Sequence, residues 1–125
     1  MTEQEIRTIL NRQREYFATG ATLSRKFRAE QLGKLKASLQ RHEEELNAAL
    51  QQDLGKSRME SYMCEIGLTL SELTWMQKHL RGLMQEKRVP TPLSQFAAIS
   101  FRSPSPYGTV LIMSPWNYPV LLTLH

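Results

Sequence analysis

Proline is missing from residues 1–89 of this sequence, and acidic residues are missing from residues 90–125. All six prolines lie in 90–125, where Arg102 is the only Lys or Arg, whereas all 12 acidic residues lie in 1–89. Because proline removes a backbone hydrogen bond and clashes with the preceding helical turn, long helices are possible before Pro90 and excluded after it. A segment with one charge is poorly suited to be a solvated linker, so we expect 90–125 to be buried against something.

Cysteine is almost absent, since Cys64 is the only one. It has no partner for an internal disulfide, and the sequence shows neither a signal peptide nor a long apolar run, so we expect a reducing, cytoplasmic location and no membrane partner. The formal net charge of +4 is mild. Lys and Arg alternate with Glu, which is typical of solvated helix faces, and we expect no nucleic-acid partner.

Three segments of 1–89 have the periodicity of amphipathic helices. Thr2 with Glu5, and Ser57 with Glu60, have the spacing of a capping box, and Gly55 is suited to end a helix. The expected helices span about 2–20, 22–55 and 57–88, from the capping signals that bound them.

The period changes after Pro90. We expect a strand over Phe96–Arg102, a turn over Ser103–Gly108, a second strand over Thr109–Met113 and a helix that begins at Pro119. The second strand is apolar on both faces apart from its threonine, which is typical of a covered parallel strand. Such a strand needs neighbours supplied by crossover units. These residues supply none, so we expect either a partner chain or, as the favoured explanation, a sequence that is a fragment.

The most informative motif is Ser114–Pro119, where an amide side chain lies between two prolines directly after the second expected strand. Taken alone, the residue types predict that Trp116 and Tyr118 are core aromatics and that Asn117 is a turn residue. No metal site is expected, because neither His42 nor His79 has a carboxylate, cysteine or second histidine at ligand spacing. Lys56-Ser57 follows a glycine, but the phosphate-loop pattern is incomplete and no strand precedes it.

Pro106–Pro119 resembles the strand and PWN(Y/F)P signature of the NAD(P)-dependent aldehyde dehydrogenases. Asp53–Ser57, together with Glu60 and Glu65–Gly67, resembles the class 3-like branch of that family. The similarity covers about residues 28–124. It implies an α/β parent fold with a Rossmann-type cofactor domain, of which this chain would be the mainly α-helical N-terminal part, with three amphipathic helices followed by two strands and a helix start.

The resemblance also implies a division of the chain and roles for its residues. Residues 1–89 would be the helical start of the cofactor domain, 90–108 an extended segment with an oligomerisation-arm strand, and 109–125 the first buried strand and the next helix start. The implied activity is oxidation of a small-molecule aldehyde to a carboxylic acid with NAD or NADP, through a cysteine thiohemiacetal, by a homodimer. The implied site residues are Asn117 as oxyanion donor, Met113, Ser114, Pro115 and Trp116 along the cofactor crevice, and Tyr118 in the substrate passage.

Several parts of the family's pattern are absent. In the family, the nucleophilic cysteine, the general-base glutamate and the glycine-containing cofactor loop lie further along the sequence. We therefore expect the present 125 residues to be catalytically inactive on their own. Cys64 lies within the third expected helix and is interpreted as a packing residue. Ser105 stands where the family usually has an acidic residue, a difference that affects the turn more than catalysis.

A second hypothesis remains open: a self-standing helical interaction module with an apolar docking tail. It explains the amphipathic helices and the uncharged end but not the amide between prolines. In both cases Val110–Met113 and Val120–Leu124 lack cover within this chain, so we expect poor solubility or self-association.

Overall fold

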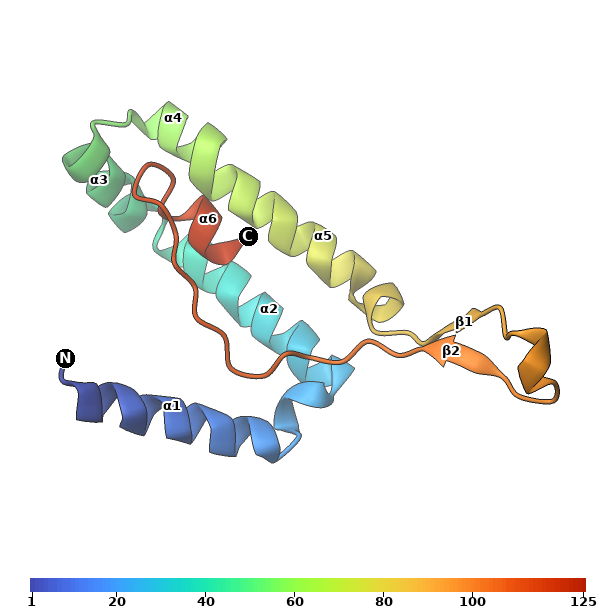
Figure 1. The fold of residues 1–125 in the computed structure, drawn as a ribbon. Coiled ribbons are helices and arrows are strands. Elements are labelled where there is room, and N and C mark those ends of the chain that lie inside the picture. Colours follow the sequence, from blue (N-terminus) through green and yellow to red (C-terminus); the bar gives the residue numbers. More distant parts are fainter.

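Two long helices, α2 (Arg25–Arg41) and α5 (Gly67–Leu83), lie side by side and form the body of the molecule (Figure 1). The computed structural model describes all residues from 1 to 125. At one end of the body, α3 (Glu43–Leu54) and the short α4 (Arg58–Ser61) connect the two helices. The core between them consists of five buried apolar side chains: Leu39, Leu50, Ile66, Leu73 and Leu80.

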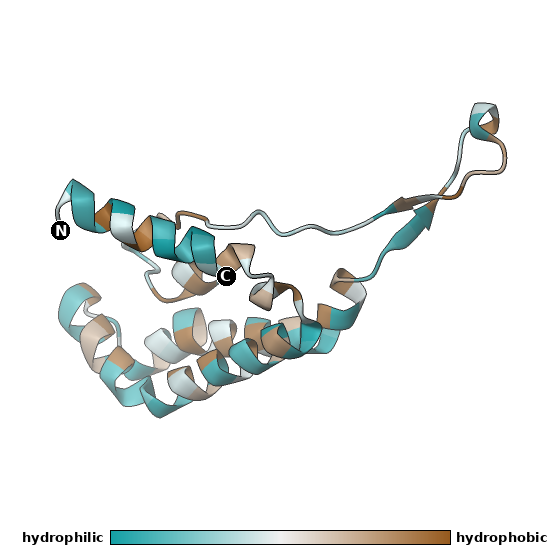
Figure 2. Cartoon of the chain, turned by 90° about the horizontal axis from the view of Figure 1, so that it is seen from below, coloured by the Kyte–Doolittle hydropathy of each residue, from teal (hydrophilic) through white to brown (hydrophobic).

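The remaining elements lie outside this body. Helix α1 (Glu3–Ala18) is set apart from α2 and α5, and Figure 2 shows hydrophobic residues recurring between hydrophilic turns along it. At the other end of the body, the antiparallel hairpin of β1 (Lys87–Val89) and β2 (Ser100–Arg102) projects outward. From the hairpin the chain returns to α6 (Leu121–Leu124), which contacts α5. No helix has the length and apolar character needed to cross a membrane.

The capping box predicted at Thr2 forms in full, whereas the one predicted at Ser57 forms only in part. Thr2 Oγ1 accepts a hydrogen bond from the backbone N–H of Glu5 (3.3 Å), and the Glu5 carboxylate accepts one from the N–H of Thr2 (2.7 Å), which completes a capping box. Ser57 Oγ accepts from the N–H of Glu60 at 3.2 Å. Gly55 ends α3 with φ of 68°, a left-handed conformation that glycine adopts without a steric cost.

The prediction of one continuous second helix over 22–55 is wrong. A 3-10 helix covers Ala21–Leu23, α2 begins after Ser24, and the chain breaks at His42, where φ is −102° and ψ is 18°. The carbonyl of Ser38 accepts from the His42 backbone N–H at 3.0 Å and lies 2.8 Å from its ring Nδ1. The His42 ring thus gives the Ser38 carbonyl a second polar partner where α2 ends, at a position with neither proline nor glycine.

The third expected helix is interrupted in a different way. Between α4 and α5, residues Tyr62–Ile66 form a π-helix, whose hydrogen bonds span one residue more than those of an α-helix. Gly67 follows it directly, and a Cβ atom there would lie 2.7 Å from the carbonyl oxygen of Tyr62. The wider turn therefore depends on a residue without a side chain.

The expected strands are confirmed only in part. Ser100–Arg102 pairs with β1, but Leu93–Gln95 is a 3-10 helix and Phe96 lies in a turn. The expected buried strand at Thr109–Met113 is wrong for this chain, because the segment has no strand beside it to receive its hydrogen bonds. Its apolar residues are exposed, including Leu111 at 81% and Met113 at 84%. No residue of 109–125 is buried.

Candidate functional site

Asn117 lies in a turn that leads from the extended segment into α6. Its side chain is exposed and forms no hydrogen bond within the chain. The amide NH₂ is therefore available to donate to an oxygen atom of a ligand. The backbone of the turn, by contrast, is hydrogen-bonded to the rest of the chain on both sides of the Asn117 side chain.

On one side, the carbonyl oxygen of Asn117 accepts a hydrogen bond from Lys56 Nζ at 2.7 Å. The same ammonium group donates to Glu65 Oε1 at 2.5 Å and lies 4.1 Å from the centroid of the Tyr118 ring, a distance typical of a cation–π contact. Lys56 is buried, with 9% of its surface exposed. All the polar contacts of this lysine are thus directed at the turn or at its counter-ion.

On the other side, Glu65 Oε2 accepts a hydrogen bond from the backbone N–H of Val120 at 2.8 Å. Glu65 is fully buried, and each of its carboxylate oxygens has one donor. A buried carboxylate without such partners would be strongly unfavourable. The backbone groups of the turn therefore complete the hydrogen bonding of the buried ion pair, and the ion pair completes theirs.

The turn is also closed by its own side chains. Thr123 Oγ1 donates to the carbonyl oxygen of Pro119 at 2.5 Å, and Ser114 Oγ lies 2.6 Å from the same Thr123 hydroxyl. These contacts join the residues before the turn to the first turn of α6. Ser114 is thus brought to the base of the same loop that carries Asn117.

The predicted cofactor residues lie along the approach to this turn. Met113 and Trp116 are each 84% exposed, and Ser114 and Pro115 are exposed between them. Trp116 also lines a hollow between the loop and α3, together with Leu46, Ala49, Leu50, Asp53, Leu54, Pro119 and Val120. The predicted site residues, 113–118, therefore form one stretch of the chain. Their roles in catalysis, cofactor binding and substrate passage stay predictions.

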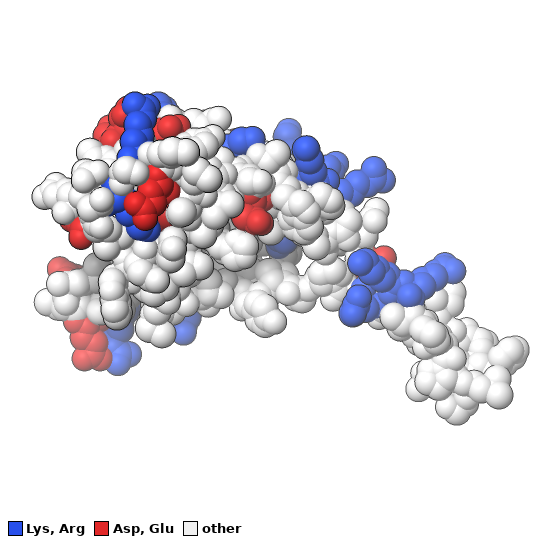
Figure 3. Space-filling model, turned by 90° about the horizontal axis from the view of Figure 1, so that it is seen from above, with Lys and Arg blue, Asp and Glu red and all other residues white.

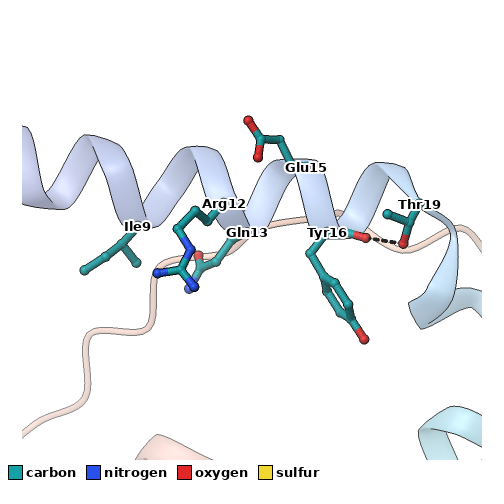
Figure 4. Close-up of a pocket in the computed structure, with 6 residues that line it drawn as sticks. All are labelled: Ile9, Arg12, Gln13, Glu15, Tyr16 and Thr19. Carbon is teal, nitrogen blue, oxygen red and sulfur yellow. Dashed lines mark hydrogen bonds between the residues drawn. The ribbon is translucent and has the colours of Figure 1, made fainter.

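Another hollow lies beside α1, away from these residues. It is lined by Ile9, Arg12, Gln13, Glu15, Tyr16 and Thr19 (Figure 4). The Thr19 hydroxyl donates to the carbonyl oxygen of Tyr16 at 2.6 Å, which is a helix-end contact. This hollow contains none of the predicted site residues. No group of three or more His, Cys, Asp and Glu side chains gathers as a metal site would require.

Cys64 lies in the π-helix next to Glu65 and is partly buried, and its thiol forms no hydrogen bond. Neither Lys56 nor Glu65 was identified as a site residue from the sequence. Glu65 did carry a signal: it precedes Thr69 and Leu73 at helical spacing and so shares the buried face of α5. A lone carboxylate on a buried face requires a partner.

The comparisons with known proteins all indicate the same family. The sequence model of the aldehyde dehydrogenase family matches residues 1–125. The chain is 42% identical over 107 residues to the 4,4'-diaponeurosporen-aldehyde dehydrogenase of Staphylococcus aureus, covering 86% of this chain and 23% of that protein. It is 43% identical over 115 residues to human aldehyde dehydrogenase family 3 member B1, covering 92% of this chain and 25% of that protein.

The fold is also shared with a solved structure. The structure of Staphylococcus aureus AldH in a substrate-bound state superimposes with a TM-score of 0.92 at 39% sequence identity, over 95% of this chain and 26% of that one. The present chain thus spans about a quarter of the length of the relatives it matches. Its mostly helical architecture with two strands is the architecture of the corresponding part of that fold.

Proposed function

This chain belongs to the aldehyde dehydrogenase family, and we propose that it forms part of an enzyme that oxidises an aldehyde to a carboxylic acid with NAD or NADP. The observation that carries the proposal is the Asn117 turn: an unpaired amide donor is exposed while its backbone is bonded to buried charges. A neutral, fixed donor is suited to stabilise an oxyanion, because it does not titrate and needs little reorganisation.

In the proposed reaction, a cysteine thiolate attacks the carbonyl carbon of the aldehyde and gives a thiohemiacetal. The carbonyl oxygen becomes negative in this step, and the Asn117 NH₂ group donates to it. A nicotinamide cofactor bound along Met113–Trp116 would supply the acceptor for the hydride that leaves the former aldehyde carbon. Water then releases the acid from the thioester. Cys64 is not proposed as the nucleophile, because its side chain is partly buried in the π-helix and its thiol makes no hydrogen bond.

The proposed cofactor wall is the extended segment Met113–Trp116. Its exposed apolar side chains and free backbone groups fit one side of a nucleotide crevice. Met113 and Trp116 would contact the cofactor by their apolar surfaces, and the Ser114 hydroxyl would keep its contact with Thr123. Tyr118, 37% exposed and in contact with Lys56, is proposed to line the substrate passage.

The function is tested by Asn117→Ala in the full-length gene product, assayed with NAD and NADP over a panel of aldehydes. Loss of one oxyanion donor is expected to lower kcat by about 10²–10³-fold. Asn11→Ala, on the exposed face of α1, is the matched control and should leave kcat unchanged. A kcat for Asn117→Ala within twofold of the wild type would contradict the proposed role.

We also propose that the 125 residues alone do not oxidise aldehydes. The support is that Cys64, the only cysteine, lacks an activating contact, and that the chain spans about a quarter of its relatives. The purified chain is assayed for aldehyde-dependent NADH and NADPH formation. Turnover by this chain, abolished by Cys64→Ser, would contradict the proposal.

A homodimer assembled through the hairpin is proposed for the full-length product. The hairpin projects from the body, and Figure 3 shows basic residues at its base and an uncharged tip. Five large apolar side chains of this arm are exposed: Val89, Leu93, Phe96, Ile99 and Phe101. Light scattering should give a dimer for the wild type and a monomer for Phe96→Ser/Ile99→Ser.

A cytoplasmic location, supported by the single cysteine, is proposed and is tested by cell fractionation.

A further inference from the structure

We propose that Lys56 and Glu65 are the positioning residues of the Asn117 amide. This inference rests on the proposed function, since it assigns to the buried ion pair the task of fixing an oxyanion donor. The two residues touch neither aldehyde nor cofactor in this proposal. They act through the backbone of the turn.

The first observation is that these two side chains provide every hydrogen bond between residues 103–125 and the rest of the chain. One runs from Lys56 Nζ to the Asn117 carbonyl oxygen (2.7 Å), and the other from the Val120 N–H to Glu65 Oε2 (2.8 Å). The two bonded groups lie on either side of Tyr118-Pro119. The turn is thus fixed at both ends, across sequence separations of 61 and 55 residues.

The second observation is the burial of the pair. Glu65 is fully buried and Lys56 is 9% exposed, so water competes little for their hydrogen bonds, which are stronger in such surroundings. The exposed pair between Arg58 and Glu44, also near this end of the body, has side chains that are 69% and 71% exposed and makes no hydrogen bond to the loop. Burial together with two bonds to one turn distinguishes Lys56 and Glu65 from an ordinary surface pair.

The third observation is the local backbone of Glu65. It lies in the π-helix Tyr62–Ile66, and Gly67 supplies the space that this wider turn requires. π-helical turns are rare and occur frequently at functional sites. Here the π-helix presents the Glu65 carboxylate to the loop and to Lys56 at once.

The chemical consequence concerns the direction of the Asn117 side chain. Hydrogen bonding of its carbonyl oxygen fixes the peptide plane from which the side chain leaves, while the NH₂ group stays unpaired. The helix that follows, α6, has only four residues and contributes little stability of its own. Without the ion pair the turn would be held only by apolar contacts and by its internal bonds. A displacement of about 1 Å in a catalytic group can cost about 10²-fold in rate.

The test uses the double variant Lys56→Met/Glu65→Leu in the full-length gene product. Replacing both charges leaves no unpaired buried ion, and such replacements are often neutral for stability. We expect kcat to fall by about 10²-fold. Arg58→Met/Glu44→Leu is the matched control and should keep wild-type kcat.

A merely structural role is separated from positioning by adding Asn117→Ala. If Lys56 and Glu65 act through this amide, the triple variant should be no slower than Asn117→Ala alone, because the donor they position is already gone. If the losses multiply instead, the pair acts independently of Asn117 and the proposal is overturned. A kcat of the double variant within twofold of the wild type would overturn it as well.

Hydrogen exchange gives a second readout that does not depend on activity. Measured by mass spectrometry on peptides covering 114–121, exchange should be at least about tenfold faster in the double variant and unchanged in the Arg58/Glu44 control. An enzyme inactive on every aldehyde, with this acceleration present, would refute the proposed function and leave the loop attachment intact. Unchanged exchange would overturn the attachment itself.

Should the double variant fail to fold, Lys56→Arg gives the same readouts. It keeps the charge but replaces a compact ammonium with a larger planar group. We expect an intermediate loss of kcat and an intermediate increase in exchange over 114–121. Wild-type values for both in this variant would overturn the proposal.

Discussion

The helical body, residues 25–83, and the tail, residues 103–125, are organised by different interactions. All ten buried residues of the chain lie between Leu39 and Leu80, and the tail contributes none. The body has a core of its own, together with caps and helical hydrogen bonds that form locally. The tail has neither, and its hydrogen bonds to the body are the two made by Lys56 and Glu65. The body can therefore specify its own structure, whereas the position of the tail depends on one ion pair.

The largest effect is expected from breaking that connection on one side only. Lys56→Met leaves Glu65 buried without its counter-ion, which should lower the free energy of unfolding by about 3–5 kcal/mol. Arg58→Met, which breaks the exposed pair with Glu44, should cost less than about 1 kcal/mol. Urea titrations of both variants, followed by circular dichroism, measure the difference. Equal losses of unfolding free energy in the two variants would mean that the buried pair contributes no more to stability than the exposed pair.

A second prediction compares apolar residues of the two regions. Ile66 is fully buried, so Ile66→Ala should lower the free energy of unfolding by about 3 kcal/mol. Leu111 is 81% exposed in the tail, and Leu111→Ala should change it by no more than about 0.5 kcal/mol. The same urea titrations apply. A large loss for Leu111→Ala would show that the tail is covered in solution, for example by a second copy of the chain.

A third prediction compares two glycines within the body. Gly67→Ala should be destabilising by about 1–3 kcal/mol, because the new Cβ would lie 2.7 Å from the Tyr62 carbonyl oxygen. Gly82→Ala meets no atom within 4 Å and should stabilise α5 by up to about 1 kcal/mol. Melting temperatures should shift in opposite directions. A stabilising Gly67→Ala would argue against the π-helix.

The smallest effect is expected at the cap of α4. Ser57→Ala removes the acceptor for the N–H of Glu60 and should cost about 1 kcal/mol. Ser105→Ala is the control in the tail, where the serine is exposed and makes no hydrogen bond within the chain, and it should be neutral. A neutral Ser57→Ala would indicate that water replaces the cap.

The same contrast explains what the sequence predicts about the fold. The helices follow from local patterns, and the capping residues Thr2 of α1 and Ser57 and Gly55 of the body mark boundaries that the structure confirms. The break at His42 carries no proline or glycine signal, so periodicity alone extends the helix through it. The expected strand at Thr109–Met113 is wrong here because a strand forms only with a neighbour, and pairing is a property of the whole fold.

The site divides in the same manner. Asn117 and its neighbours were identified by the resemblance of Ser114–Pro119 to a family signature, which is contiguous in sequence. Lys56 and Glu65 were not, because their contacts to the loop span 61 and 55 residues. No local pattern encodes a contact of that range. A buried charge at helical spacing with apolar residues is the one signal that could have indicated Glu65.

The π-helix between α4 and α5 also affects how this region tolerates insertions and deletions. Each residue of an α-helix turns the chain by about 100°. Removing one residue from an α-helical stretch therefore rotates all later side chains of that helix to a different face. A deletion within Tyr62–Ile66 can instead be absorbed, because the wide turn would tighten into an ordinary one and α5 would keep its direction. Leu73 and Leu80 would then stay in the core, and only the aim of the Glu65 carboxylate would be lost.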